Sequence, residues 1–296
     1  MAKNAPTTDI DPVHVLAEAG YAPPAAITQI EGGWITLIWR FQTADGRTLG
    51  LRLYRPADGI DEQARREKLT IDALRAAGLP APAIEKAGTY DGCPYFVMEW
   101  LPGRPLIDDL EKKLWRLWSL ASEFGRLQAR IHRLQPRELA YENRAWADYS
   151  VDDDVAAAVK TNARDESLCH FDYHPLNVLS NGSGITGLID FSQSGLADRR
   201  ADLGRTQALL AAAPIPPGPI KPVLQVLRKQ FALFWRRGYK AEAGDFPIEP
   251  LYEAWGAASF IRDIEEAVAD GRGWGTPEDV ARIHAYLADR KRAAGL

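Results

Sequence analysis

The stretch Cys169-His170-Phe171-Asp172-Tyr173-His174-Pro175-Leu176-Asn177-Val178-Leu179, followed by Gly187-Leu188-Ile189-Asp190-Phe191, is the most informative part of this chain. It places a His two residues before an Asp and an Asn five residues after that Asp. A second Asp lies 18 positions beyond the first, between Ile and Phe. This order predicts a catalytic loop, a short hairpin and a metal-binding turn, which is the layout of kinase-type phosphoryl transfer.

The residue types in this stretch fit that chemistry. Asp172 would accept or orient the proton of an attacking hydroxyl group. Asn177 and Asp190 would hold Mg²⁺, a hard cation that prefers oxygen ligands and bridges nucleotide phosphates. Taken singly, His170 could be a buried residue bonded to backbone, Asn177 a turn residue and Asp190 a strand-end cap. Their occurrence together and in this order favours the catalytic interpretation.

Length and composition limit the class of protein. With 296 residues, the chain is long enough for one large domain or two closely joined ones. A net charge of −4 gives no reason to expect nucleic acid as a partner, and it suits a cationic substrate only weakly. Cys93 and Cys169 form neither a disulfide framework nor a metal-ligand pattern. Residues 1–7 lack the apolar core of a signal peptide, and no apolar run reaches the ~20 residues of a membrane span. We therefore expect a cytoplasmic protein without membrane contact; its oligomeric state stays open.

The first hundred residues predict a small antiparallel sheet with helices. Residues 11–19 predict a short helix, because Pro12 suits the first helical position and Gly20 can close it. β-Branched and aromatic residues predict strands at 35–41, 48–54, 83–88 and 95–100, and an amphipathic pattern predicts a helix at 62–77. The sheet should end near Leu101-Pro102-Gly103.

The remainder of the chain is predicted to be mostly helical. Residues 114–134 show a long amphipathic pattern, whereas residues 139–167 are polar and predicted to be irregular. Within the irregular segment, Asp152-Asp153-Asp154 could attract a cationic acceptor or could form a solvated loop. Further helices are expected at 202–212, 223–237, 250–270 and 277–293. We place the boundary at Pro102-Gly103, which gives an N-terminal nucleotide-binding lobe of residues 1–102 and a C-terminal helical catalytic and acceptor-binding lobe of residues 103–296.

On these motifs the chain resembles the aminoglycoside phosphotransferase-like branch of the protein-kinase-like superfamily. The resemblance covers nearly the whole chain and is sharpest at His170 to Asn177 and at Ile189-Asp190-Phe191. That family opens its catalytic loop with His-Gly-Asp, whereas this chain has Phe171 in the Gly place. The resemblance implies an α+β, two-lobed protein-kinase-like fold. It also implies a phosphotransferase that moves the γ-phosphoryl group of ATP or GTP, with Mg²⁺, to a hydroxyl group of a small molecule.

The resemblance extends to further positions, each of which is commonplace when taken alone. Arg52 stands where kinases carry the Lys that contacts nucleotide phosphates, and Glu67 would be the helix carboxylate that pairs with it. Other implied roles are a phosphate-covering loop at Gly32 and Gly33, an adenine-binding interlobe hinge at Glu99, Trp100 and Leu101, and structural support of the catalytic loop by His170 and Asp202.

Several alternatives stay open at the level of sequence. The acceptor, with or without a cationic group, could be an aminoglycoside-like antibiotic or a metabolite such as choline, homoserine or a sugar. Trp235, Trp255 and Trp274 could line an acceptor pocket or a cation-binding cage, or could simply pack in the core. A nucleotide-binding pseudokinase with a regulatory role is a different class, and intact Asp172, Asn177 and Asp190 argue against it. A protein kinase is disfavoured, because the chain between Asp190 and Asp202 is too short for a peptide-binding activation loop.

Overall fold

The computed structural model describes residues 10–30, 36–137, 139, 146–164, 166–215, 218–219, 221–269, 271 and 275–296. The chain divides into two compact units: residues 1–68 with 82–101, and residues 69–81 with 102–296. The sequence-based boundary placed residues 69–81 in the N-terminal lobe, whereas their packing groups them with the second unit. No helix among the described residues is both long and apolar enough to cross a membrane.

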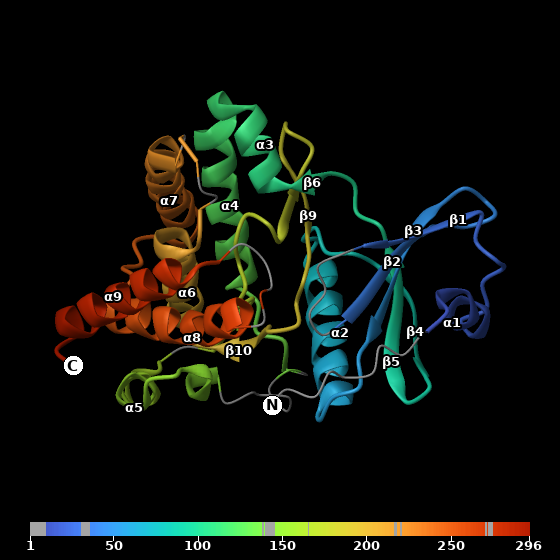
Figure 1. The fold of residues 1–296 in the computed structure, drawn as a ribbon, viewed down its shortest axis with the longest axis horizontal. Coiled ribbons are helices and arrows are strands. Elements are labelled where there is room, and N and C mark those ends of the chain that lie inside the picture. Colours follow the sequence, from blue (N-terminus) through green and yellow to red (C-terminus); the bar gives the residue numbers. More distant parts are fainter. Residues whose placement is uncertain are drawn as a thin grey trace. The chain divides into compact units, whose positions relative to one another are not determined.

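The first unit is a five-stranded antiparallel sheet with order β1-β2-β3-β5-β4 (Figure 1). Its elements are α1 (Pro12–Glu18), β1 (Ala26–Ile30), β2 (Thr36–Gln42), β3 (Thr48–Tyr54), the first turns of α2 (Ile60–Ala76), β4 (Ile84–Tyr90) and β5 (Cys93–Glu99). One set of sheet side chains packs against Val15 and Leu16 of α1. A second set, including Tyr54 and Phe96, packs against Ile60 and Ala64 of α2. The sheet therefore buries apolar side chains against both helices.

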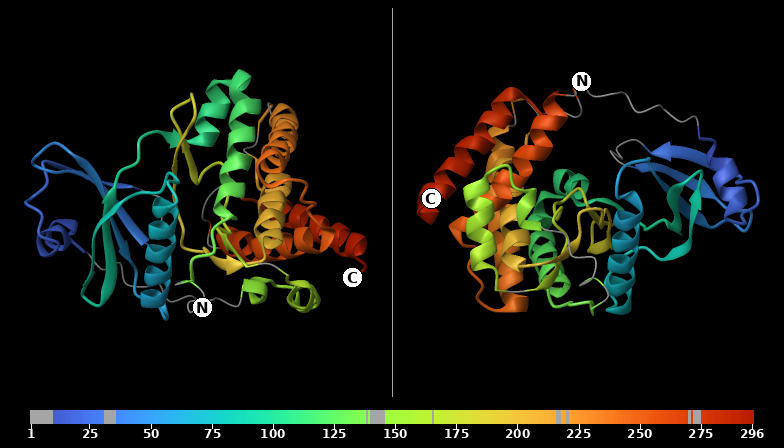
Figure 2. Two further views of the ribbon diagram at one scale, coloured as in Figure 1. Left: turned by 180° about the vertical axis from the view of Figure 1, so that it is seen from behind. Right: turned by 90° about the horizontal axis from the view of Figure 1, so that it is seen from below.

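The second unit is mostly helical. Its helices are the last turns of α2, α3 (Leu106–Lys112), η1 (Leu114–Arg116), α4 (Leu117–Ile131), η3 (Trp146–Tyr149), α5 (Asp153–Asn162), α6 (Arg199–Ala212), α7 (Lys221–Ala243), α8 (Pro250–Ala269) and α9 (Pro277–Ala294). Short strands are β6 (Arg104–Pro105), β7 (Ser167–Cys169), β8 (Val178–Ser180), β9 (Ile185–Leu188) and β10 (Gly195–Ala197), paired as β10-β7 and β6-β8-β9. Figure 2 shows the α4/α7 pair and the α6, α8 and α9 group from two further sides. The α+β class predicted from sequence is confirmed.

Helices α6 and α8 cross at two glycines. A Cβ atom added to Gly204 would lie 2.0 Å from the Tyr252 carbonyl oxygen, and one added to Gly256 would lie 2.4 Å from the Gly204 carbonyl carbon. Only glycine permits backbones to approach this closely. This crossing fixes α6, which carries Asp202 and Arg205, against α8, which carries Trp255.

The expectation of an irregular segment at residues 139–167 is wrong for its second half. Residues 153–162 form α5, with Asp152 as N-cap accepting the Val155 N–H at 3.1 Å. Val155, Ala156 and Val159 of this helix are buried. The three acidic residues are therefore a cap and the first helical turn, where negative side chains are favoured by the helix dipole.

Candidate active site

The loop between β7 and β8 carries Asp172, and its backbone is held by a fully buried carboxylate from α6. Asp202 Oδ1 accepts the N–H of Phe171 at 2.5 Å, and Oδ2 accepts Gln128 Nε2 at 2.8 Å. His132 Nε2 lies 2.9 Å from the same Oδ2 oxygen. Burial by itself raises the pKa of Asp202, but these partners more than compensate and the pKa is lowered. Asp202 is thus an ionised anchor for the backbone directly before Asp172.

His170 links the catalytic loop to the residues that follow β9. Its Nε2 lies 3.2 Å from the Ile189 carbonyl oxygen, and the Asp172 N–H donates to its Nδ1 at 3.3 Å. Burial lowers the pKa of His170 and outweighs the opposite effect of Asp202, Asp172 and Asp190. His170 is therefore a neutral imidazole, and its bonding pattern places the proton on Nε2.

The β8–β9 hairpin brings Asn177 and Asp190 to its open end. Asn177 directly precedes β8, Asp190 follows β9 after Ile189, and Val178 pairs with Leu188 in the antiparallel register. The Ile189 N–H donates to the Asn177 carbonyl oxygen at 3.0 Å, which extends the pairing by one step. Asn177 Nδ2 also donates to Asp172 Oδ2 at 2.8 Å and to the Asp172 carbonyl oxygen at 2.9 Å. Asn177 is thus bonded to Asp172, and its backbone pairs with Ile189, the residue directly before Asp190.

Asp172 is paired electrostatically with His174. Asp172 Oδ1 lies 3.3 Å from His174 Nε2, and the two side chains are 22% and 21% exposed. Burial by itself raises the pKa of Asp172, but His174, Arg205 and His170 lower it well below its ordinary range. Burial lowers the pKa of His174, yet Asp172 and then Asp190 raise it above its ordinary value of 6.5. Asp172 is therefore ionised at neutral pH, and the Asp190 carboxylate lies close enough to influence the same imidazole.

These side chains offer the oxygen donors that Mg²⁺ prefers. Because Asn177 Nδ2 is turned toward Asp172, its Oδ1 is the atom left to ligate a cation. Asp190 adds a carboxylate held at φ 61°, a left-handed conformation that Asp adopts more readily than most residues. An amide oxygen with one or two carboxylates, completed by phosphate oxygens and water, is a typical Mg²⁺ environment. The residues present fit the ion.

In the first unit, Arg52 of β3 forms a buried ion pair with Glu67 of α2. Arg52 Nη1 lies 2.8 Å from Glu67 Oε1, and the side chains are 10% and 1% exposed. Tyr54 donates its hydroxyl to Glu67 Oε2 at 2.5 Å, and the Arg52 guanidinium lies 5.5 Å from the centre of the Tyr54 ring. The pair predicted from sequence is therefore present, and Tyr54 orients its acidic member.

The other residues predicted to contact the nucleotide are Glu99, Trp100 and Leu101 at the end of β5, and the glycine pair Gly32 and Gly33. β5 ends at Glu99, whose N–H donates to the Ala83 carbonyl oxygen at 2.8 Å. Trp100 and Leu101 follow the strand and are partly buried. Gly32 and Gly33 lie outside the described residues.

Sequence reasoning underestimated two residues close to Asp172. His174 lies in the predicted catalytic loop but was given no role in the chemistry, whereas it forms an ion pair with Asp172. Arg205, on α6, lowers the pKa of Asp172 from a position 33 residues away and was not predicted. Its spacing of three residues from Asp202 was a usable signal, because residues three apart share one face of a helix.

Comparison with known proteins places the chain in a family. Residues 26–239 match the model of the phosphotransferase enzyme family, which is more than half of the chain. The protein belongs to this family and is a phosphotransferase. A search of curated proteins by sequence finds no match.

Solved structures share the fold over nearly the whole chain. A thermostable mutant of the aminoglycoside phosphotransferase APH(4)-Ia, in a complex with AMP-PNP and hygromycin B, has a TM-score of 0.62 at 18% identity and covers 94% of this chain and 96% of its own. The amicoumacin kinase hAmiN, with AMP-PNP, Ca²⁺ and Ami, has a TM-score of 0.62 at 15% identity over 96% and 94%. A Plasmodium vivax ethanolamine kinase has a TM-score of 0.57 at 14% identity over 90% and 81%. The kinase-like fold predicted from sequence is confirmed.

Proposed function

We propose that this phosphotransferase moves the γ-phosphoryl group of ATP or GTP to a hydroxyl group of a small molecule, with Mg²⁺ as the metal. The convergence of Asp172, Asn177 and Asp190 at the open end of the β8–β9 hairpin carries the proposal. The fold shared with nucleotide-bound phosphotransferases supports it. The acceptor is either an antibiotic of the aminoglycoside kind or a cellular metabolite such as choline, homoserine or a sugar.

In the proposed reaction, Asp172 accepts a hydrogen bond from the acceptor hydroxyl and so directs the oxygen of that hydroxyl at the γ-phosphorus. The new bond joins this oxygen to phosphorus, and the bond from phosphorus to the bridging nucleotide oxygen breaks. The nucleoside diphosphate then leaves, and the hydroxyl proton passes to Asp172. Because the pKa of Asp172 is low, we infer that its main contribution is orientation, with the proton transferred late.

The other residues bind and position the nucleotide in this proposal. Bound Mg²⁺ would neutralise phosphate charge, and Asn177 and Asp190 are the residues that would hold it. Arg52 would donate parallel hydrogen bonds to phosphate oxygens, as a guanidinium can. Its pairing with Glu67 supports this role because the pair fixes the guanidinium position. Main-chain atoms from Glu99 to Leu101 would bind the base, which leaves ATP and GTP as alternatives.

The test is Asp172→Ala, measured as nucleoside diphosphate release that depends on an acceptor. We expect turnover to fall by roughly 10³-fold or more, because the aligned carboxylate is lost. Asp148→Ala is a suitable control, since Asp148 is 53% exposed and pairs only with Lys160 among the described residues. Equal turnover of wild type and Asp172→Ala with a true substrate would refute the assignment and favour a nucleotide-binding regulatory protein.

A further inference from the structure

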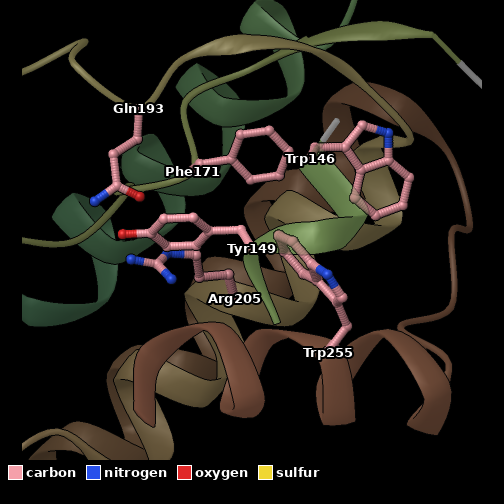
Figure 3. Close-up of a pocket in the computed structure, with 6 residues that line it drawn as sticks. All are labelled: Trp146, Tyr149, Phe171, Gln193, Arg205 and Trp255. Atoms are coloured by element: carbon pink, nitrogen blue, oxygen red, sulfur yellow. The ribbon is translucent and has the colours of Figure 1, made fainter. Parts of the chain in front are cut away.

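Aromatic side chains of the second unit lie in two contrasting settings. Beside the catalytic loop, the aromatic rings drawn in Figure 3 pack so closely that about 10 Å³ of space remains between them, room for no more than one water molecule. On η1 and α4, in contrast, Trp115 and Trp118 are 70% and 50% exposed. Burial of an indole ring is strongly favourable, so two exposed Trp side chains on neighbouring turns mark a surface that another body covers.

Most of the exposed large apolar residues lie on two neighbouring helical segments of the second unit. The backbones of α4 and α7 are in contact, since a Cβ atom added to Gly238 would lie 2.0 Å from the Ser122 carbonyl oxygen. One turn before this crossing, the Trp118 and Phe234 ring centres are 6.1 Å apart. Figure 2 shows the two helices side by side. We call the exposed surface here the tryptophan face; its apolar residues, each at least 42% exposed, are Leu114, Trp115, Trp118, Val223, Val226 and Leu233.

Helix α7 has two apolar sides, and the tryptophan face uses the outer one. Val223, Val226 and Leu233 follow one another at intervals of three and seven residues, which places them on one side of the helix. A surface helix of a globular protein ordinarily has a single apolar stripe, which faces the core. The buried residues of α7, on its core side, are Phe231, Trp235, Gly238 and Tyr239.

The sequence around the tryptophan face is basic, although the chain as a whole is slightly acidic. From Leu203 to Ala241 there are seven Lys and Arg residues and no Asp or Glu, whereas the whole chain has 36 basic and 40 acidic residues. On the outer side of α7, Lys229 lies between Val226 and Leu233. Arg237 lies one turn beyond Leu233 on the same side.

Two of these cations are not neutralised by a carboxylate. Among the residues that the structure describes, Lys229 and Arg237 form no ion pair, and the Arg237 guanidinium lies 4.9 Å from the centre of the Phe234 ring. The other exposed cations of α7 are paired, Arg236 with Glu253 at 3.4 Å and Lys240 with Asp245 at 2.9 Å. The tryptophan face therefore combines exposed indole rings with uncompensated positive charge.

Charge distinguishes between the bodies that could cover such a face. A second copy of the chain, related by a twofold axis, would bring the unpaired cations of both copies together, which weakens binding. The Trp118 and Phe234 rings meet across the seam between α4 and α7, which disfavours a partner helix lying in a groove there. A bilayer with anionic lipids offers negative charge over its whole surface, and its interface is where indole rings are favoured.

We propose that the tryptophan face binds the surface of a membrane that contains anionic lipids. Trp115 and Trp118 lie at the level of the headgroups in this contact, and Lys229 and Arg237 lie against the lipid phosphates. The contact is peripheral, since it uses exposed side chains of folded helices. It revises the sequence-based expectation of no membrane contact, which considered only a signal peptide and a spanning segment. Binding through this face does not require the phosphotransfer reaction.

Co-sedimentation of the full-length protein with vesicles measures this binding. One vesicle is pure phosphatidylcholine, and the other contains equal parts of phosphatidylcholine and phosphatidylglycerol. We expect at least about tenfold tighter binding to the anionic vesicles. Raising the salt concentration from about 0.1 M to about 1 M shortens the Debye length from about 10 Å to about 3 Å and should reduce this preference. Equal binding to both vesicles would overturn the proposal, and binding to neither would overturn it in favour of an acidic protein partner.

A matched pair of apolar positions locates the contact. Val226→Asp places a carboxylate in the tryptophan face and should weaken binding to the anionic vesicles by at least about tenfold. Val151→Asp makes the same change outside this face, at a residue of similar exposure (48% against 58%), and should bind as the wild type does. Both side chains are exposed, so both variants should fold. Equal loss in the two variants would mean that the tryptophan face is not the contact.

A matched pair of basic positions tests the electrostatic part. Lys229→Glu should also weaken binding to the anionic vesicles by at least about tenfold. Lys86→Glu makes the same change at an exposed position of β4, in the first unit, and should retain wild-type binding. If both variants lose affinity equally, net charge alone governs the binding and the proposal fails.

Sedimentation velocity of the wild type and Val226→Asp tests the second copy as occupant. We expect both proteins to have the same oligomeric state in solution, because lipid and not protein covers the face. A wild-type dimer that Val226→Asp dissociates would assign the tryptophan face to a second copy and overturn the proposal.

Discussion

Phe171 shows how one residue can keep the backbone of a motif while changing its chemistry. Its φ is 60°, a left-handed conformation that glycine adopts without strain and that the family resemblance places at a Gly. The side chain is nevertheless 5% exposed and packed on Trp146 and Trp255. The energy of burial therefore outweighs the strain of the backbone, which costs about 1–2 kcal/mol in this region.

Phe171→Gly should consequently destabilise the protein although it relieves backbone strain. Removing a buried Phe side chain costs about 3–5 kcal/mol, and the relieved strain returns about 1–2 kcal/mol. We expect a net loss of about 1–4 kcal/mol in the free energy of unfolding, measured by urea denaturation. Asp91→Gly is the matched control, since Asp91 is exposed with φ 48°, and this change should be neutral or stabilising. A stabilised Phe171→Gly would show that the ring contributes no packing energy.

The Asp172–His174 pair predicts a dependence of stability on pH. The pKa of His174 is raised above its ordinary value of 6.5, mainly by Asp172 against the effect of burial. A raised pKa in the folded state contributes stability that is fully present below the unfolded value and lost as the pH rises through the folded value. The wild type should therefore lose more stability between pH 6 and pH 9 than His174→Gln does.

Urea denaturation of both proteins at each pH measures this difference, and parallel pH profiles would show that His174 gains nothing from its partner. The same variant carries a second expectation for activity. Without the neighbouring cation, the pKa of Asp172 rises, because His174 is the largest influence that lowers it. The acid limb of kcat/KM should then move to higher pH in His174→Gln.

At the scale of elements, α5 illustrates what sequence periodicity could not supply. Residues 153–162 have only three buried side chains, so the amphipathic pattern of this segment is weak. The helix depends on its N-cap and on an ion pair 139 positions away, between Asp152 Oδ2 and Lys291 Nζ at 2.6 Å. A partner that distant cannot be found from local pattern.

The hairpin and its flanking residues, in contrast, were predictable, because the motif is local. His170, Asp172 and Asn177 lie within eight consecutive residues, and one short β-ladder determines where Asp190 falls. The Arg52–Glu67 pair followed only from the resemblance. The influence of Arg205 on Asp172 escaped prediction, because it depends on how α6 and α8 cross at Gly204 and Gly256.

Asp152→Ala should destabilise the protein through α5. Loss of the N-cap hydrogen bond costs about 0.5–2 kcal/mol, and the partly buried Lys291 loses its nearest partner. Asp154→Ala, two residues further on, removes a side chain that is 82% exposed and lies 3.7 Å from Lys291, so it should be nearly neutral. Urea denaturation compares the two, and equal effects would mean that only the charge near Lys291 matters, not the cap.

At the scale of the whole molecule, α2 contributes residues to both compact units. Glu67 belongs to the first unit and pairs with Arg52, whereas Thr70 belongs to the second, where its hydroxyl lies 2.9 Å from that of Ser194. The two residues are three positions apart on one continuous helix. Our proposal assigns phosphate binding to Arg52, in the first unit, and metal binding to Asp190, in the second, so a substitution at either residue should weaken nucleotide binding.

Nucleotide binding can be measured as a thermal shift. A ligand present at about 100 times its Kd adds about 2.7 kcal/mol to the stability of a protein that binds it only when folded. Mg²⁺ with ATP or GTP should therefore raise the Tm of the wild type, and EDTA should remove most of the increase. Arg52→Ala should reduce the shift, because phosphate contacts are lost, and Asp190→Ala should abolish its Mg²⁺-dependent part. Asp148→Ala, at an exposed position, should retain the full shift. If Asp190→Ala keeps a Mg²⁺-dependent shift of wild-type size, the metal binds at a site other than Asp190. The phosphates that the metal bridges would then also lie elsewhere.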